Sequence, residues 1–216
     1  MDYMKLEEKL SQFKGAANES DLQKMFEELA PAFLYGGYIQ VRKEYQIFIR
    51  TVELYFHSEK EDGIHDPIVY HRNGRDIDYL SYFPLMTLNA HASGFDITFE
   101  NETFEYRASA LIRSYEVKNK EGLFLKWEKN KDGKYMFALS PDYAFNTQST
   151  YLYTLLNGFS LGKDNGIYWV DSPRKQSVAI TEKTRQNVFK SESEFEYIKS
   201  NAQCERRWSF NREEIV

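Results

Sequence analysis

The sequence is poor in cysteine: Cys204 is the only one among 216 residues. An intramolecular disulfide is therefore excluded, and so is a zinc site built on several cysteines. The chain also has no run of about 18 apolar residues, the length that a membrane-spanning helix needs. Its first residues lack the apolar core of a secretory signal. We therefore expect a cytoplasmic protein without a membrane partner.

Positive charge is in deficit, because 28 Lys and Arg stand against 33 Asp and Glu and give a net charge of −5. This balance argues against a phosphate-binding surface spread over the whole molecule, but it leaves a local basic groove open. The lysines between Lys118 and Lys134 alternate with acidic residues. We interpret this segment as a solvated hairpin, with a phosphate-contacting loop as the alternative.

The motifs of metal and nucleotide chemistry are missing as well. The four histidines show no H-E-x-x-H spacing, and the sequence contains neither a glycine-rich nucleotide loop nor a G-x-S-x-G nucleophile turn. We therefore expect no bound metal and no cofactor. The histidines are His57, His65, His71 and His91.

Aromatic residues, in contrast, are abundant at 16% of the chain, and they favour half-buried strands. We expect a single domain over 1–216, with N-terminal helices in 1–36 packed on it. Ser20 and Gln23 form a capping-box pattern, and Pro31 is expected to begin a new helical turn rather than lie inside a helix. Further helices are expected at 150–156 and 192–201. The expected strands are 38–45, 46–57, 95–100, 104–117, 123–127, 135–139, 167–170 and 178–181.

Two of these strands place chemically interesting residues on one face, since alternate residues of a strand point the same way. Glu53, Tyr55 and His57 share a face of the strand 46–57, and its opposite face is apolar. A carboxylate desolvated by aromatic rings suits general-base chemistry, and the rings could stack on a planar ligand. A half-exposed pair without a catalytic role is the alternative. The strand 104–117 places Arg107, Ser109, Leu111 and Arg113 on one face.

Several segments carry short motifs in a fixed order along the chain. Leu29 to Gly36 resembles a helix end L-A-x-x-L-L-G, and Phe48 to Tyr55 resembles a strand G-x-I-V-E-T-E-A-Y. Glu61 to His65 is similar to E-D-x-A-x-H, and Ala110 to Glu116 is similar to V-L-L-R-A-L-E-P. In this order the chain resembles the alkyladenine (3-methyladenine, methylpurine) DNA glycosylase family. Ile167 to Val170, Thr184 to Val188 and Arg207 to Phe210 extend the resemblance.

The resemblance implies a fold and an activity. The fold is a single α+β domain with a curved antiparallel β-sheet core and flanking short helices. The activity is that of a base-excision-repair DNA N-glycosylase, which hydrolyses the N-glycosidic bond of a modified purine with a glutamate-activated water and without a metal or cofactor. An anionic carboxylate near the sugar stabilises the positive charge that develops as the base leaves.

The same resemblance assigns roles to individual residues. Glu53 corresponds to the general base, and Arg113 to the arginine that orients it; both are the predicted catalytic residues. The predicted base-binding pocket consists of Tyr55, His65, Met86 and Asp96. The wedge that replaces a flipped nucleotide falls at Asn89, or at His91 in a shifted register.

Some positions depart from the family pattern, which has tyrosines where this chain has Met86 and Asn89. An asparagine cannot act as a stacking wedge. The acidic charge also weighs against duplex DNA. The ligand is therefore expected to be a modified purine base in DNA or a purine-like small molecule. The alternatives are a nucleoside or single-strand N-glycosidase, and a non-catalytic or small-ligand-binding homologue. The oligomeric state is left open.

Overall fold

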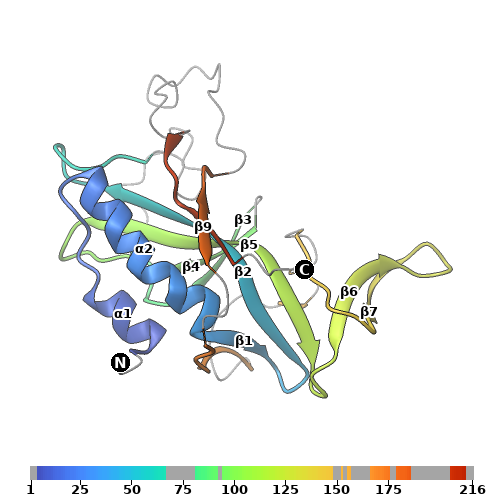
Figure 1. The fold of residues 1–216 in the computed structure, drawn as a ribbon. Helices are drawn as coiled ribbons and strands as arrows, with labels where there is room; N and C mark the ends of the chain where they lie inside the picture. Colours follow the sequence, from blue (N-terminus) through green and yellow to red (C-terminus); the bar gives the residue numbers. More distant parts are fainter. Residues whose placement is uncertain are drawn as a thin grey trace.

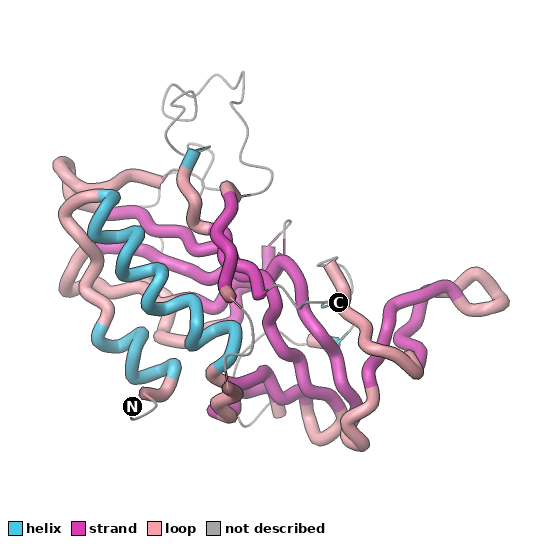
Figure 2. Tube along the Cα trace, viewed as in Figure 1, coloured by secondary structure: helices cyan, strands magenta, loops and turns pink. Residues whose placement is uncertain are grey.

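A computed structural model of the chain describes residues 4–66, 81–91, 94–147, 152, 155–156, 166–175, 179–185 and 205–212. Its described part is an antiparallel sheet of ten strands with two helices over one face (Figures 1 and 2). This arrangement agrees with the expected α+β class. The particular fold of the glycosylase family stays a prediction.

The two helices are α1 (Leu6–Gln12) and α2 (Glu19–Tyr35). The cap of α2 differs from the prediction at Ser20: Asn18 is the N-cap, and its side-chain oxygen accepts a 2.9 Å hydrogen bond from the Asp21 amide. Asn18 has an extended backbone, which is the conformation that an N-cap residue adopts. The helix therefore begins at Glu19, and its N-cap is Asn18 rather than Ser20 of the predicted capping box.

The prediction for Pro31 was wrong, because this residue lies inside α2. Proline has no N–H for the helical hydrogen bond and usually ends or bends a helix. Here the neighbours of Pro31 are buried against the sheet, and this packing outweighs the local cost. The helix ends at Tyr35, with Gly36 as its C-cap as expected. The buried neighbours are Ala30, Ala32, Phe33 and Leu34.

The sheet is organised around its two longest strands, β2 and β5, which pair along almost their whole length. One half of this ladder continues as β3–β4–β5–β2–β10–β9, and the other as β7–β6–β5–β2–β1–β8. The strands are β1 (Gly37–Val41), β2 (Tyr45–Ser58), β3 (Leu88–His91), β4 (Gly94–Thr98), β5 (Tyr106–Asn119), β6 (Phe124–Lys129), β7 (Tyr135–Leu139), β8 (Ile167–Asp171), β9 (Ile180–Lys183) and β10 (Ser209–Arg212).

A pair of β-bulges separates the two halves. Ser114 pairs with Thr51 and Ile112 with Val52, so Arg113 is an extra residue on β5. Tyr115 pairs with Ile49, so Arg50 is the corresponding extra residue on β2. Bulges increase the local twist, and in Figure 1 both long strands bend midway along the ladder.

The hydrophobic core lies between α2 and this sheet. Phe26 of α2 meets Trp208 edge to face, with ring centroids 5.1 Å apart. Val52, Leu54 and Phe56 point into the same core, which confirms the apolar face predicted for this strand. Their neighbours Glu53 and Tyr55 therefore lie on the opposite face of the sheet. The predicted helices at 150–156 and 192–201 lie wholly or largely outside the described residues.

Candidate functional site

Glu53, Tyr55 and Arg113 meet on the sheet face opposite α2, and strand alternation predicted that Glu53 and Tyr55 share a face. The Arg113 Nε donates a 2.7 Å hydrogen bond to Glu53 Oε2. The Tyr55 hydroxyl donates to the same oxygen at 3.0 Å. The Glu53 side chain is 0% exposed, while that of Arg113 is 15% exposed. The bulge at Arg113 brings its guanidinium to the carboxylate, because a bulge re-aims a side chain within a strand.

The pKa values of both Tyr55 and Arg113 are raised above their ordinary values. Burial raises the pKa of the Tyr55 hydroxyl well above its ordinary value, and the charge of Glu53 raises it further, against the opposing effect of Arg185 and Arg113. Burial alone would lower the pKa of Arg113, but the charge of Glu53 and hydrogen bonds to Glu53 and Tyr55 leave that pKa raised. The phenol therefore stays neutral and the guanidinium stays charged, so neither supplies a mobile proton at neutral pH.

A second ion pair lies against the first. The Arg185 guanidinium lies 4.5 Å from the centroid of the Tyr55 ring and 5.0 Å from that of Trp208. Its Nη1 donates to Asp66 Oδ2 at 2.5 Å, and both side chains are fully buried. Burial alone would lower the pKa of Arg185, but the charge of Asp66 leaves it raised. Tyr55 is thus held between the Glu53–Arg113 pair and the Arg185–Asp66 pair.

Arg206 lies beside the Arg185–Asp66 pair. Its Nη1 lies 3.8 Å from Asp66 Oδ2 and donates to the backbone oxygen of His65 at 3.1 Å. The His65 ring stacks on His57 with centroids 5.3 Å apart, and its Nε2 lies 2.8 Å from the carbonyl oxygen of Lys60. His65 is therefore engaged with the turn after β2.

The other two predicted pocket residues, Asp96 and Met86, lie in different surroundings. Asp96 is buried and close enough to Tyr55 for its charge to raise the pKa of that phenol, and it pairs with Leu111, which also pairs with Glu53. Met86, in contrast, packs against the hydrophobic core. Of the two wedge candidates, Asn89 pairs with Asp96 and His91 with Gly94, both within β3.

Two further arginine–carboxylate pairs are buried in the described part of the protein. Arg107 Nη1 lies 3.4 Å from Glu100 Oε2, and Arg212 contacts Glu116 directly. All four of these side chains are buried, like Glu53. The Glu53–Arg113 pair is therefore one of several buried arginine–carboxylate pairs in the described part of the protein, and such a pair has a structural explanation.

Sequence reasoning missed the Arg185–Asp66 pair and both bulges. The two residues of the pair are separated by 119 positions, and no periodicity links them. The bulges do leave a signal: core residues alternate up to Ile49 and again from Val52, with a shift of one position between them. The same shift separates Ile112 from Tyr115 on β5. This broken alternation in both strands could have located the bend.

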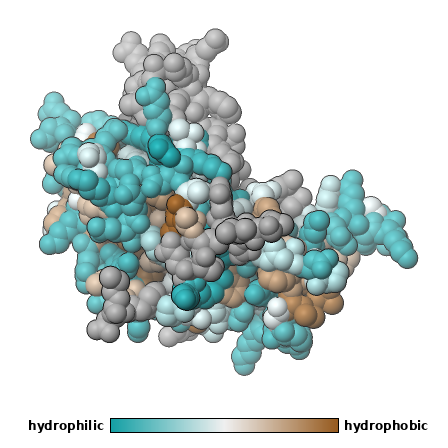
Figure 3. Space-filling model, viewed as in Figure 1, coloured by the Kyte–Doolittle hydropathy of each residue, from teal (hydrophilic) through white to brown (hydrophobic). Residues whose placement is uncertain are grey.

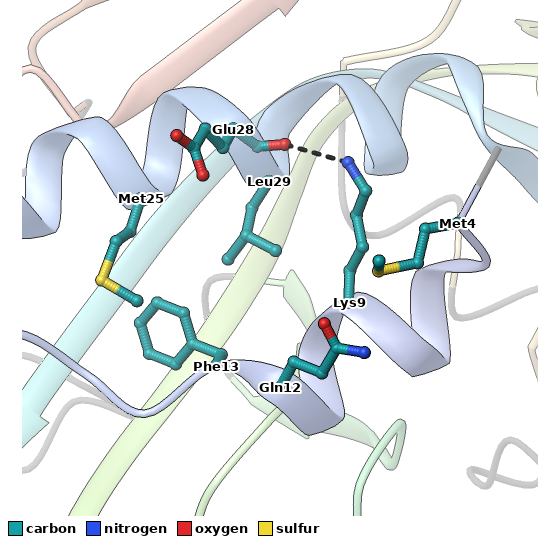
Figure 4. A pocket seen from close by; sticks show the side chains of 7 residues that line it. All are labelled: Met4, Lys9, Gln12, Phe13, Met25, Glu28 and Leu29. Carbon is teal, nitrogen blue, oxygen red and sulfur yellow. Dashed lines mark hydrogen bonds between the residues drawn. The ribbon is translucent and has the colours of Figure 1, made fainter. Parts of the chain in front are cut away.

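Two cavities lie on the helix side of the molecule, away from Glu53. One of about 340 Å³ lies between α1 and α2, where the side chains of Lys9, Phe13, Met25 and Leu29 line it (Figure 4). The other, of about 310 Å³, is lined by Lys14, Phe56 and Phe104 among others. Neither is lined by Glu53, Tyr55 or Arg113.

No helix in the described part of the chain has the length and apolar character to cross a bilayer. No group of three or more acidic, histidine or cysteine side chains within the described ranges is placed to hold a metal ion.

No family model, curated protein or solved structure matches the chain. The likeness to the alkyladenine DNA glycosylases therefore stays a prediction that rests on the sequence motifs. The catalytic and pocket roles predicted from that likeness stay predictions with it.

Proposed function

We propose that this protein acts by binding a partner through a projecting β-hairpin, and that Glu53 is a structural counter-ion rather than a catalytic base. One observation carries the proposal. All the large apolar side chains that are exposed in the described part of the chain lie within residues 123–145. We call this segment, which contains β6 and β7, the arm. The side chains are Leu123, Tyr135, Met136, Leu139, Tyr143 and Phe145.

The arm projects from the body of the sheet, and apolar residues gather in the same region of the space-filling view (Figures 1 and 3). A clustered apolar patch of this kind typically marks an interaction site, whereas scattered apolar residues do not. Aromatic contacts stiffen it: the Trp127 and Phe137 rings meet at 4.7 Å, and Trp127 stacks on Tyr135 at 6.1 Å. A preformed surface loses little conformational entropy when it binds.

The surroundings of Glu53 support a structural role. A general base must lie within hydrogen-bond reach of the water or substrate proton that it removes. The Glu53 carboxylate is fully buried, and one of its oxygens already accepts hydrogen bonds from both Arg113 and Tyr55. Burial of a charge is tolerated when it is paired in this way.

The test is base release from hypoxanthine-containing and alkylated DNA, measured with the wild-type protein and with Glu53→Gln. We expect no release by either protein and a lower stability of the variant. Release by the wild type that disappears in Glu53→Gln would contradict the proposal. The comparison requires that Glu53→Gln is folded, which circular dichroism checks.

A second candidate function is N-glycosidic hydrolysis of a modified purine in DNA, or of a purine nucleoside. Glu53 accepts hydrogen bonds from Tyr55 and Arg113, the residues that the resemblance assigns to the base-binding pocket and to the orientation of the base. Ser109 lies opposite Tyr55 in the ladder, and its hydroxyl is buried without a hydrogen-bond partner in the described part of the structure. The same is true of the Oδ1 atom of Asp66. The same assay, extended to single-stranded DNA and free purine nucleosides, tests this candidate.

A further inference from the structure

The outer strand of the arm, β7, is built as an edge that can accept another strand. Among the described strands it pairs only with β6. Its sequence, Tyr135 to Leu139, contains no charged residue and no proline. Natural edge strands usually carry charges, prolines or bulges that prevent pairing with other chains. Tyr135 and Leu139 are 54% and 61% exposed, so the side chains at both ends of the strand reach the solvent.

The hydrogen bonds at the two ends of the hairpin show which backbone groups point outward. The Asn130 amide donates to the Lys134 carbonyl, and the Ser140 amide donates to the Phe124 carbonyl. Lys134 and Ser140 therefore direct their backbone groups toward β6. Because this direction alternates along a strand, Phe137 and Leu139 direct theirs toward the outer edge.

We infer that the partner of this edge is a second copy of the chain, with the two β7 strands paired antiparallel about Phe137. In this register Phe137 lies opposite Phe137 of the other copy, and Tyr135 lies opposite Leu139. These are the positions whose backbone groups point outward, so each pair exchanges both of its hydrogen bonds. The side chains of all three also lie on one face of the arm, next to Trp127.

Side-chain chemistry favours this register. Aromatic pairs and aromatic–aliphatic pairs stabilise neighbouring strands, whereas like charges opposite each other destabilise them. The register places no charged residue of β7 opposite another, and Lys134 falls opposite Ser140. Tyr135 and Leu139, two of the most exposed apolar side chains of the arm, cover each other.

Charge favours two copies in this antiparallel arrangement. The tip of the arm, residues 126–134, has four lysines and two acids, so its charge is 4 − 2 = +2, and the rest of the chain carries −5 − 2 = −7. Antiparallel strands direct the tip of each arm toward the body of the other copy. Opposite charges are therefore brought together, and long-range attraction of this kind favours association.

This inference rests on the proposed binding function, because that function places the contact on the arm. Different results would overturn the binding function and the pairing of β7. Base release that depends on Glu53 would overturn the binding function and leave the pairing of β7 intact. A monomeric protein would overturn the pairing and leave the role of Glu53 unchanged.

The experiment uses the full chain and measures its association state by sedimentation velocity over a broad range of concentrations. The wild type is expected to form a dimer that dissociates on dilution. Phe137→Lys and Phe137→Glu each place like charges opposite each other, and each is expected to be monomeric. An equal mixture of the two variants is expected to restore the dimer, because a lysine then faces a glutamate.

Leu123→Lys is the matched control, since Leu123 is an exposed apolar residue of the arm outside β7, and this variant should remain dimeric. A monomeric wild type would overturn the inference, as would a Phe137→Lys dimer or a mixture that stays monomeric. Binding of single-stranded DNA by the monomeric wild type would point to a nucleic-acid partner instead and would equally overturn it. Restoration by mixing also shows that both variants are folded.

Discussion

Arg50 and Arg113 are the extra residues of two adjoining bulges, one on β2 and one on β5. Each reaches a buried carboxylate on the face of the sheet away from α2. Arg113 donates to Glu53 at 2.7 Å, and Arg50 Nε lies 4.0 Å from Glu116 Oε1. The bend in the sheet and these two ion pairs therefore have one origin. Changes to these pairs should be seen first in stability.

Glu53→Gln is expected to lower the free energy of unfolding by about 3 kcal/mol, because it leaves the Arg113 guanidinium mostly buried without its counter-charge. Urea denaturation measures this loss. Glu61→Gln, at an exposed position in the turn after β2, should change stability little. Replacing both Glu53 and Arg113 with methionine should cost less than the sum of the single changes. An unaltered stability of Glu53→Gln would contradict a structural role.

Arg185→Met tests the second ion pair. The substitution leaves the buried Asp66 carboxylate without its closest cation and removes the guanidinium from the faces of Tyr55 and Trp208. We expect a loss of about 3 kcal/mol and a changed fluorescence emission of Trp208. Arg207→Met, at an exposed position beside Trp208, is the control. Equal effects of the two substitutions would show that the Arg185 contacts contribute nothing specific.

The stability of the protein should fall at alkaline pH. Burial, followed by the charge of Glu53, raises the pKa of Tyr55 above its ordinary value of about 10. In the unfolded chain this tyrosine ionises near that pH, while in the folded chain it keeps its proton. The unfolded state is therefore favoured as the pH rises through about 10, and the contribution is fully present below that pH.

Tyr55→Phe should remove part of this alkaline loss, since phenylalanine does not ionise. Tyr106, whose pKa burial also raises, leaves a residual slope. The urea midpoints of wild type and variant, compared from about pH 8 to about pH 11, measure the difference. Parallel curves for the two proteins would contradict the effect.

Gly15 and Gly122 form a matched pair of glycine positions with positive φ, +74° and +81°. A Cβ at Gly15 would lie 2.8 Å from the Phe56 ring, whereas a Cβ at Gly122 would meet nothing within 4 Å. Gly122→Ala should therefore cost about 1 kcal/mol from the backbone alone. Gly15→Ala should cost clearly more, because it also displaces a core ring. Equal thermal midpoint shifts would contradict this difference.

The parts of this structure that the sequence predicted are those governed by local periodicity. Alternation placed Val52 and Leu54 in the core and Glu53 on the opposite face, and both placements are confirmed. The contact between Glu53 and Arg113 followed not from periodicity but from the resemblance to the glycosylase family, which implies that the arginine orients the glutamate. The Arg185–Asp66 pair did not follow, because it depends on how distant segments pack. Pro31 shows the reverse case, in which tertiary packing overrides a strong local preference.

The paired bulges also bear on how this chain could change in length. Ile49 and Val52 on β2, like Ile112 and Tyr115 on β5, would keep their core positions in a chain from which both Arg50 and Arg113 were deleted. Their strands would then pair residue for residue, without a bulge. Such a deletion would straighten the sheet and remove two cations, yet turn no core side chain outward. The bend is thus a separable insertion, which a shorter relative of this protein could lack while keeping the same core.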